Sequence, residues 1–212
     1  MVALESEDDV LAQGDEAPPF ELPGADGETH ALSDFADREA ALVVFTCNHC
    51  PYAQAKFDEL NALAAEYDDL AVVGVNSNDA EAYPDDSLDR MTDLVADGTI
   101  RYDAYLRDES QDVAAAYGAR CTPDPFLLDN DSEARSASEQ SSGDEPRDGT
   151  FRVAYHGRLD DALNPDDEPS EREMQAHVEA LLAGEEVTAE EKPSRGCSIK
   201  WTPGNEPDYW EA

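Results

Sequence analysis

The cysteine pair Cys47 and Cys50, separated by Asn48 and His49, constrains the fold more than any other feature of the sequence. It follows the apolar run 41–45, which is typical of a buried strand. After Pro51, apolar residues recur at steps of three and four, which predicts a helix. At such a junction the N–H groups and the dipole of the helix N-terminus favour a thiolate over a thiol. The placement therefore favours dithiol redox chemistry over half of a zinc site, another context in which two cysteines have this spacing.

The charge of the chain is strongly negative: 51 acidic residues against 14 basic ones give a net charge of −37. The acidic residues are spread through segments with clear apolar periodicity, and 40% of the residues are hydrophobic, so we expect a folded core. A lysine-poor, acidic surface is typical of salt-loving organisms, in which salt screens the repulsion. Nucleic-acid and membrane partners are not expected, because phosphate binding needs clustered Lys or Arg.

The N-terminal residues 1–10 contain neither a basic segment nor an apolar core, so the sequence predicts no signal peptide. No apolar run reaches the roughly 18 residues that a membrane-spanning helix needs. We therefore expect a cytoplasmic protein. In that reducing compartment, four cysteines indicate catalysis, redox sensing or metal binding rather than a disulfide framework.

The apolar pattern predicts one α/β domain over residues 13–184, preceded by a mobile acidic leader (1–12) and followed by a tail (185–212). A β-hairpin is expected at 13–37 and a solvated, Ser-rich acidic loop at 130–150. The remaining expected strands are 40–46, 70–75, 100–106, 126–129 and 151–155, and the expected helices are 51–67, 87–97, 110–117 and 174–182. The tail ends in Trp201, Tyr209 and Trp210, whose large apolar faces predict that it packs on the domain.

Several segments resemble the thioredoxin fold, and in particular its redoxin branch, the alkyl hydroperoxide reductase and thiol-specific antioxidant superfamily. A finer similarity is to the thiol-disulfide isomerase or thioredoxin-like subgroup. The resemblance covers about residues 13–209. The segments that carry it are 14–22, 43–52, 76–79, 83–87, 121–129, 157–161 and 192–201.

The resemblance implies a thiol–disulfide oxidoreductase in which Cys47 attacks a target disulfide and Cys50 resolves the mixed disulfide. Cys47 is then expected to be the more exposed thiol and to have the lower pKa. A protonated His49 would stabilise its thiolate and make the couple more oxidising. Pro123 corresponds to the cis-proline that faces the dithiol, and Thr122 would present its backbone to a substrate chain. No cofactor and no metal are implied; the partners would be protein or small-molecule disulfides and an electron-donating thiol system.

Two departures from related patterns bear on the activity. Thioredoxins carry a buried Asp six residues before the first cysteine, where this chain has Ala41, so Asp58 or Glu59 would have to substitute. The Pro and Thr that precede a peroxidatic cysteine in peroxiredoxins are absent. A thiol peroxidase using Cys47 is therefore the alternative activity, and a redox-sensing or zinc-stabilised interaction module is the second alternative. Residues 83–87, Asp160 and Asp161 belong to the similar pattern but receive no chemical role.

The other two cysteines, Cys121 and Cys197, leave several interpretations open. They can be reduced and packed, form a second redox couple, staple the tail as a disulfide, or join Cys47 and Cys50 around zinc. Lys192 and Lys200, two of only three lysines, flank Cys197 and indicate that the tail docks on the acidic domain. We therefore predict an ordered tail near the active-site end, with Cys197 within reach of Cys121.

Overall fold

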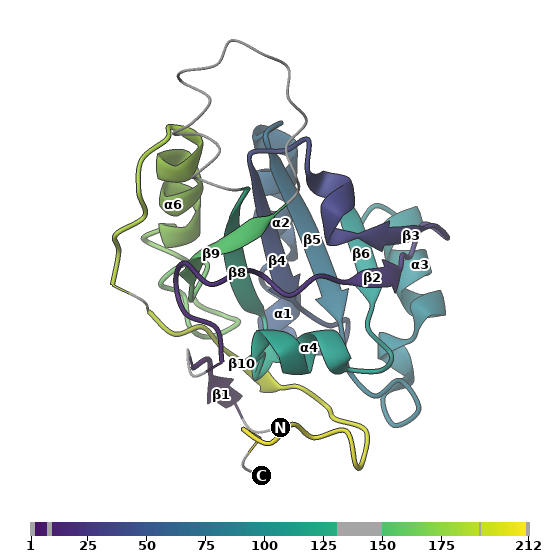
Figure 1. The fold of residues 1–212 in the computed structure, drawn as a ribbon. Coiled ribbons are helices and arrows are strands. Elements are labelled where there is room, and N and C mark those ends of the chain that lie inside the picture. The colour runs from purple at the N-terminus through teal and green to yellow at the C-terminus, as the bar shows by residue number, and fades with distance from the viewer. Residues whose placement is uncertain (1–2, 8–9, 131–149, 191, 211–212) are drawn as a thin grey trace.

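A five-stranded mixed sheet forms the centre of the molecule (Figure 1). The computed structural model describes residues 3–7, 10–130, 150–190 and 192–210, so the expected loop 130–150 lies almost entirely outside the described residues. The sheet order is β6-β5-β4-β8-β9. Strands β4, β5 and β6 are parallel to one another, β8 is antiparallel to β4, and β9 is antiparallel to β8. The strands are β4 (Ala40–Phe45), β5 (Leu70–Asn76), β6 (Ala104–Arg107), β8 (Asp124–Asn130) and β9 (Phe151–His156). This arrangement is the expected thioredoxin fold, and the expected strands at 126–129 and 151–155 lie side by side in it as β8 and β9.

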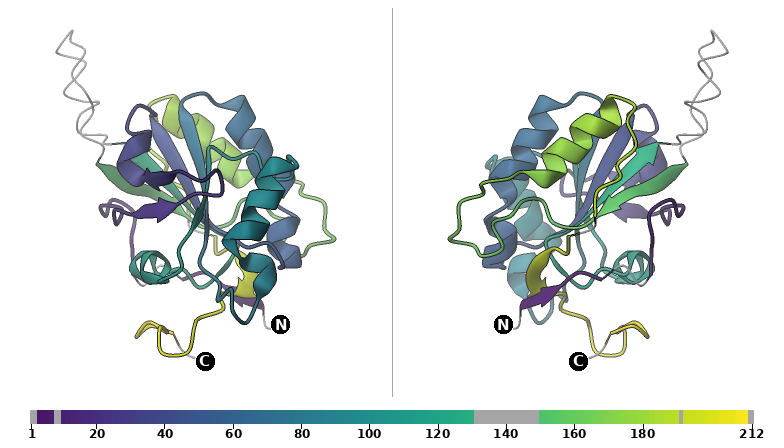
Figure 2. Two further views of the ribbon diagram at one scale, coloured as in Figure 1. Left: turned by 90° about the vertical axis from the view of Figure 1, so that its right-hand side faces the viewer. Right: turned by 90° about the vertical axis from the view of Figure 1, so that its left-hand side faces the viewer.

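Both faces of the sheet are covered, which explains why β4 and β5 are continuously apolar and fully buried (Figure 2). Side chains alternate between the faces along each strand: Val43 packs toward the N-terminal hairpin, and Leu42 packs toward α2 and α6. The covering elements on the first face are β2 (Glu21–Pro23), β3 (Thr29–Ala31), η1 (Leu32–Phe35) and α4 (Asp112–Tyr117). Those on the second face are α2 (Phe57–Glu66) and α6 (Glu173–Leu182).

The helix that follows the dithiol is divided in two, although its apolar period predicts one helix. α1 (Pro51–Gln54) ends before Lys56, which is the residue preceding α2. The Lys56 ammonium binds the buried carboxylate of Asp160 at 2.6 Å and the carbonyl of Ala162 at 3.0 Å. These contacts join the helix break to the loop after β9, a long-range interaction that a helical period does not encode.

A second, small sheet lies at the lower end of the molecule in Figure 1, close to both termini. Its order is β1-β10-β7, formed by β1 (Ala3–Glu5), β10 (Arg195–Ser198) and β7 (Cys121–Thr122), and both pairings are antiparallel. The expectation of a mobile leader is therefore wrong for the residues of β1. They are held because β10 offers them a free strand edge, and Ser6 adds hydrogen bonds to Ser194 in both directions.

Aromatic side chains of the tail lie against the domain. Trp201 packs against the core face that carries the hairpin, and its ring lies 5.9 Å from that of Trp210. The Tyr209 hydroxyl donates to the carbonyls of Ala114 and Ala119. No helix within the described ranges has the length and apolar character needed to cross a membrane.

Candidate active site

The dithiol lies at the carboxyl end of β4, against the segment that links β7 to β8. Cys47 Sγ is 3.2 Å from the Thr122 hydroxyl, and Cys50 Sγ is 3.5 Å from the Thr122 carbonyl oxygen. The peptide bond between Thr122 and Pro123 is cis. The predicted cis-proline is thus confirmed, and the structure brings Cys47, Cys50 and Thr122 together as the sequence indicates.

The exposure of the two thiols and the order of their pKa values differ from the expectation. Cys47 and Cys50 are both 0% exposed, so Cys47 is not the more accessible one. The hydrogen bond from the Cys47 thiol lowers the pKa of Cys50 to about 5; burial opposes this shift, and the Cys197 thiol and the Ala53 N–H add to it. The same hydrogen bond, burial and the negative charge of Asp86 raise the pKa of Cys47. The pair therefore shares one negative charge, held mainly on Cys50.

The reversed order of the pKa values has a local cause. Cys50, not Cys47, is the residue that precedes the first turn of α1, and the backbone N–H of Ala53 in that turn helps to lower the pKa of its thiol. The helix N-terminus thus stabilises a thiolate at Cys50. Cys47 lies one step further back and faces the carboxylate of Asp86 instead.

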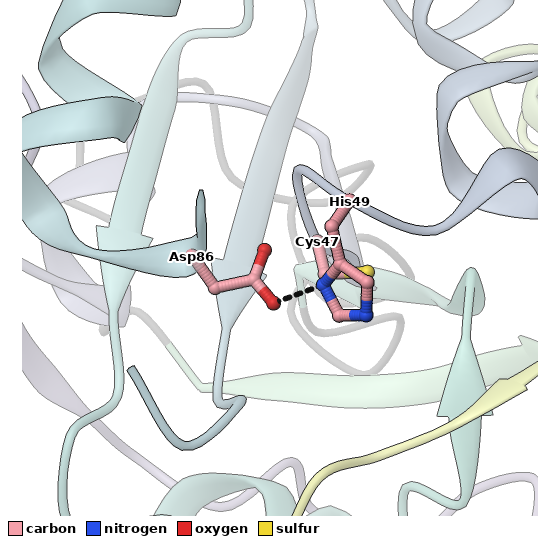
Figure 3. A group of neighbouring side chains, drawn as sticks. All are labelled: Cys47, His49 and Asp86. Atoms are coloured by element: carbon pink, nitrogen blue, oxygen red, sulfur yellow. Dashed lines mark hydrogen bonds and ion pairs between the residues drawn. The ribbon is translucent and has the colours of Figure 1, made fainter. Parts of the chain in front are cut away.

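His49 forms an ion pair with Asp86, which ends the short helix η2 (Pro84–Asp86). The distance between His49 Nδ1 and Asp86 Oδ2 is 2.5 Å, and the Asp86 side chain is fully buried. This contact raises the pKa of His49. Burial alone would raise the pKa of Asp86, but hydrogen bonds from His49 and Asn78 hold it below its usual value. Figure 3 shows the imidazole close to both the carboxylate and the side chain of Cys47.

Asp86 is the functional residue that the sequence reasoning missed. Its carboxylate also accepts the backbone N–H of Asn48 at 2.7 Å, which fixes the loop between the two cysteines. The expected substitutes do not take this place: Asp58 is exposed, and Glu59 pairs with Arg172 at 3.3 Å. The available signal was the position of Asp86 shortly after β5, since the carboxyl ends of the parallel strands β4 and β5 meet at one edge of the sheet.

An aromatic ring and a cation complete the surroundings of His49. The imidazole stacks on Tyr83, with 5.1 Å between ring centroids, and the Lys200 ammonium lies 5.8 Å from the centre of the same tyrosine ring. Among the described residues, His49 Nε2 is buried without a hydrogen-bond partner. The nearby Lys200 opposes protonation of His49, so the raised pKa of this histidine depends on Asp86.

One group of side chains in the described part of the chain is close enough to bind a metal ion. Cys47, His49 and Asp86 offer sulfur, nitrogen and oxygen atoms within 4.8 Å of one another, a donor set that suits zinc. The group does not include Cys121, so the site does not correspond to zinc held by four cysteines.

Of the interpretations left open for Cys121 and Cys197, the structure has the one without a disulfide: all four cysteines are free thiols. Cys197 lies opposite Thr122 in the sheet, whereas Cys121 lies opposite Ser198. Because neighbouring residues of a strand point to opposite faces, the side chains of Cys121 and Cys197 diverge. Cys121 hydrogen-bonds Pro123 and Ser194, and Cys197 instead contacts Cys50. The tail therefore lies near the dithiol, as predicted, and Cys197 is a diagonal neighbour of Cys121 in the small sheet, but its thiol contacts Cys50 rather than Cys121.

Residues 13–137, more than half of the chain, match the AhpC/TSA family. The chain belongs to the AhpC/TSA family. A family assignment at this level agrees with the redoxin-type hairpin and with the dithiol after β4.

Two solved structures are similar to this AhpC/TSA protein over nearly its whole length. An uncharacterized conserved protein from Geobacillus kaustophilus is 38% identical, with 96% of this chain and 98% of that chain covered and a TM-score of 0.80. A hypothetical protein from Sinorhizobium meliloti 1021 is also 38% identical, with 94% and 99% covered and a TM-score of 0.76. A candidate thiol:disulfide interchange protein, DsbE, from Chlorobium tepidum shares the fold at 24% identity, with 81% and 99% covered and a TM-score of 0.54. A search of curated proteins finds no match.

Proposed function

We propose that this AhpC/TSA protein is a thiol–disulfide oxidoreductase that works through the Cys47–Cys50 couple. The observation that carries the proposal is a buried dithiol whose Cys50 has a pKa lowered to about 5, first by the Cys47 thiol and then by Cys197 and Ala53. At neutral pH such a sulfur is a thiolate, the reactive form. The cis peptide before Pro123 and the contact of Cys47 with Thr122 supply the expected surroundings.

The electrostatics favour Cys50 as the attacking sulfur, although the resemblance gives that role to Cys47. The Cys50 thiolate attacks one sulfur of a target disulfide, and the other sulfur leaves as a thiolate. Cys47 then loses its proton and attacks Cys50, the bond between Cys50 and the target breaks, and the second target sulfur leaves as a thiolate. Cys47 and Cys50 are then joined by a disulfide, and the target becomes a dithiol by taking up the proton of Cys47 and one from solvent. The carboxylate of Asp86, within 4.8 Å of Cys47 Sγ, faces the sulfur that gives up this proton.

The test is reduction of insulin disulfides with dithiothreitol as electron donor. We expect that Cys47→Ser and Cys50→Ser each abolish the activity, and that Cys121→Ser, a matched change of a third buried thiol, leaves it close to wild type. A wild-type rate in the double variant of Cys47 and Cys50 would refute the proposal. Hydrogen peroxide consumption measured on the same proteins decides against the alternative, thiol peroxidase, if it is slow where insulin reduction is fast.

We also propose that this activity takes place in a cytoplasm with a high salt concentration. The net charge of −37 supports a protein that works in the cytoplasm of a salt-accumulating organism, where counterions screen the surface. The same charge disfavours nucleic acids and anionic membranes as partners. The proposed couple instead requires protein or small-molecule disulfides and a thiol reductant. Insulin reduction that is fastest near 2 M KCl agrees with this setting, whereas an optimum at low salt contradicts it.

A further inference from the structure

The tail strand β10 lies where a substrate chain would be expected to bind. Thr122 precedes the cis-proline, and Cys197 pairs with it in an antiparallel register. The Thr122 hydroxyl lies 3.5 Å from the Cys197 carbonyl. A Cβ atom on Gly196 would approach the Thr122 carbonyl oxygen to 2.0 Å, so only glycine allows the two backbones to pack this closely. The backbone before Pro123 is thus already occupied by the chain itself.

The side chain of Cys197 faces the dithiol. Its thiol and its backbone N–H both hydrogen-bond Cys50 Sγ, and the residue is 2% exposed. Cys47, Cys50 and Cys197 belong to one buried cluster with Ala53 and Phe57. Three sulfur atoms therefore lie in one buried site. The fourth, that of Cys121, instead hydrogen-bonds Pro123 and Ser194.

The burial of the site decides which sulfur can reach Cys50 in the closed structure. Both thiols of the pair are 0% exposed, so an external disulfide reaches them only after the surrounding structure opens. Cys197 needs no such movement. Burial and the charge of Cys50 together raise the pKa of Cys197 to about 12 in the reduced protein. Oxidation of Cys50 removes that charge, while the neighbouring Lys200 still favours a Cys197 thiolate.

We propose that Cys197 is a third redox thiol of the site and exchanges disulfides with Cys50. In the oxidised protein, the Cys197 sulfur attacks Cys50 Sγ, the bond between Cys47 and Cys50 breaks, and a bond between Cys50 and Cys197 forms. Cys47 leaves as a thiolate and takes up the proton that Cys197 loses, so the step needs no outside oxidant or reductant. The inference rests on the proposed function, since it assumes that Cys47 and Cys50 cycle through a disulfide.

The experiment maps disulfides in the full chain after treatment with diamide, followed by alkylation in denaturant and mass spectrometry without reduction. In Cys47→Ser, and in Cys47→Ala as a second variant, we expect a disulfide between Cys50 and Cys197, with Cys121 alkylated. The double variant of Cys47→Ser with Cys121→Ser should form the same bond. The inference is overturned if Cys50 stays alkylatable, joins Cys121 or links two chains while Cys197 remains a free thiol.

Insulin reduction by the wild-type protein separates this inference from the proposed function. If the wild-type protein reduces insulin but Cys47→Ser forms no disulfide between Cys50 and Cys197, the role of Cys197 as a third redox thiol is refuted and the proposed oxidoreductase activity stands. If Cys47→Ser forms the disulfide between Cys50 and Cys197 but the wild-type protein does not reduce insulin, the proposed oxidoreductase activity is refuted and the exchange between Cys50 and Cys197 stands. In Cys197→Ser, diamide should still form the disulfide between Cys47 and Cys50, and the disulfide between Cys50 and Cys197 should be absent.

Discussion

Replacing the Asp86 carboxylate with an amide should move the negative charge of the dithiol from Cys50 to Cys47. Asp86→Asn keeps the size of the side chain and removes the charge that opposes a Cys47 thiolate. It also removes the partner that holds His49 protonated, and the charged imidazole interacts with Cys50. The two effects act in the same direction, because one stabilises a thiolate at Cys47 and the other destabilises the thiolate at Cys50.

The size of the effect follows from the distance. Unit charges 4.8 Å apart interact by about 3.5 kcal/mol at an effective dielectric constant of about 20. That energy corresponds to about 2.5 pKa units, so the relative reactivity of the two thiols should change by about 100-fold or more. Each carboxylate oxygen accepts two hydrogen bonds, from Asn48 and Asn76 on one side and from His49 and Asn78 on the other. An amide leaves at least one donor unpaired, which costs about 1–3 kcal/mol of stability.

The assay is alkylation by iodoacetamide between pH 4 and 8, with the modified cysteine identified by mass spectrometry. In the wild type, labelling of Cys50 should rise with pH around a midpoint of about 5, because the thiolate that exists above its pKa is the species that reacts. In Asp86→Asn, Cys47 should become the preferred site. Asp85→Asn, the same change at the exposed neighbouring residue, is the control and should behave like wild type.

Two results would refute this reasoning. If Cys47 is the preferred site already in the wild type, the position of Cys50 at the start of α1 does not determine the charge. If Asp86→Asn and Asp85→Asn label alike, the carboxylate of Asp86 does not act on the dithiol.

Three further predictions concern the potential, the stability and the salt dependence. His49→Gln should make the couple more reducing, by about 30 mV for each pKa unit that Cys50 gains, measured in glutathione buffers; an unchanged potential would exclude His49 from the mechanism. Lys56→Met leaves the buried Asp160 without its cation and should cost about 3–5 kcal/mol in urea unfolding, whereas Lys192→Met, at a more exposed ion pair, should change the midpoint far less. Stability should rise between 0.1 M and 2 M KCl, compared with salts of other anions at equal ionic strength, and equal stability would contradict the acidic-surface argument.

Local patterns in the sequence were enough to predict the frame of the site. The apolar run before Cys47 and the helical period after Pro51 predict the strand and the helix start, because side-chain periodicity follows from the geometry of each element. The motif around Pro123 predicted the cis peptide by resemblance, and Trp201 predicted a packed tail. These features depend on neighbours in the sequence or on a recognisable motif, and the structure confirms them.

The tertiary structure decided the chemistry within that frame. Which sulfur carries the charge depends on Asp86, which the fold brings to the dithiol from after another strand, and on the residue at which α1 begins. The contact of Cys197 with Cys50 depends on the pairing of β10 with β1 and β7. Strand pairing and electrostatic coupling between distant segments have no period along the chain. The sequence therefore determined that a dithiol stands at a helix start, and only the fold determined which charges and which third sulfur surround it.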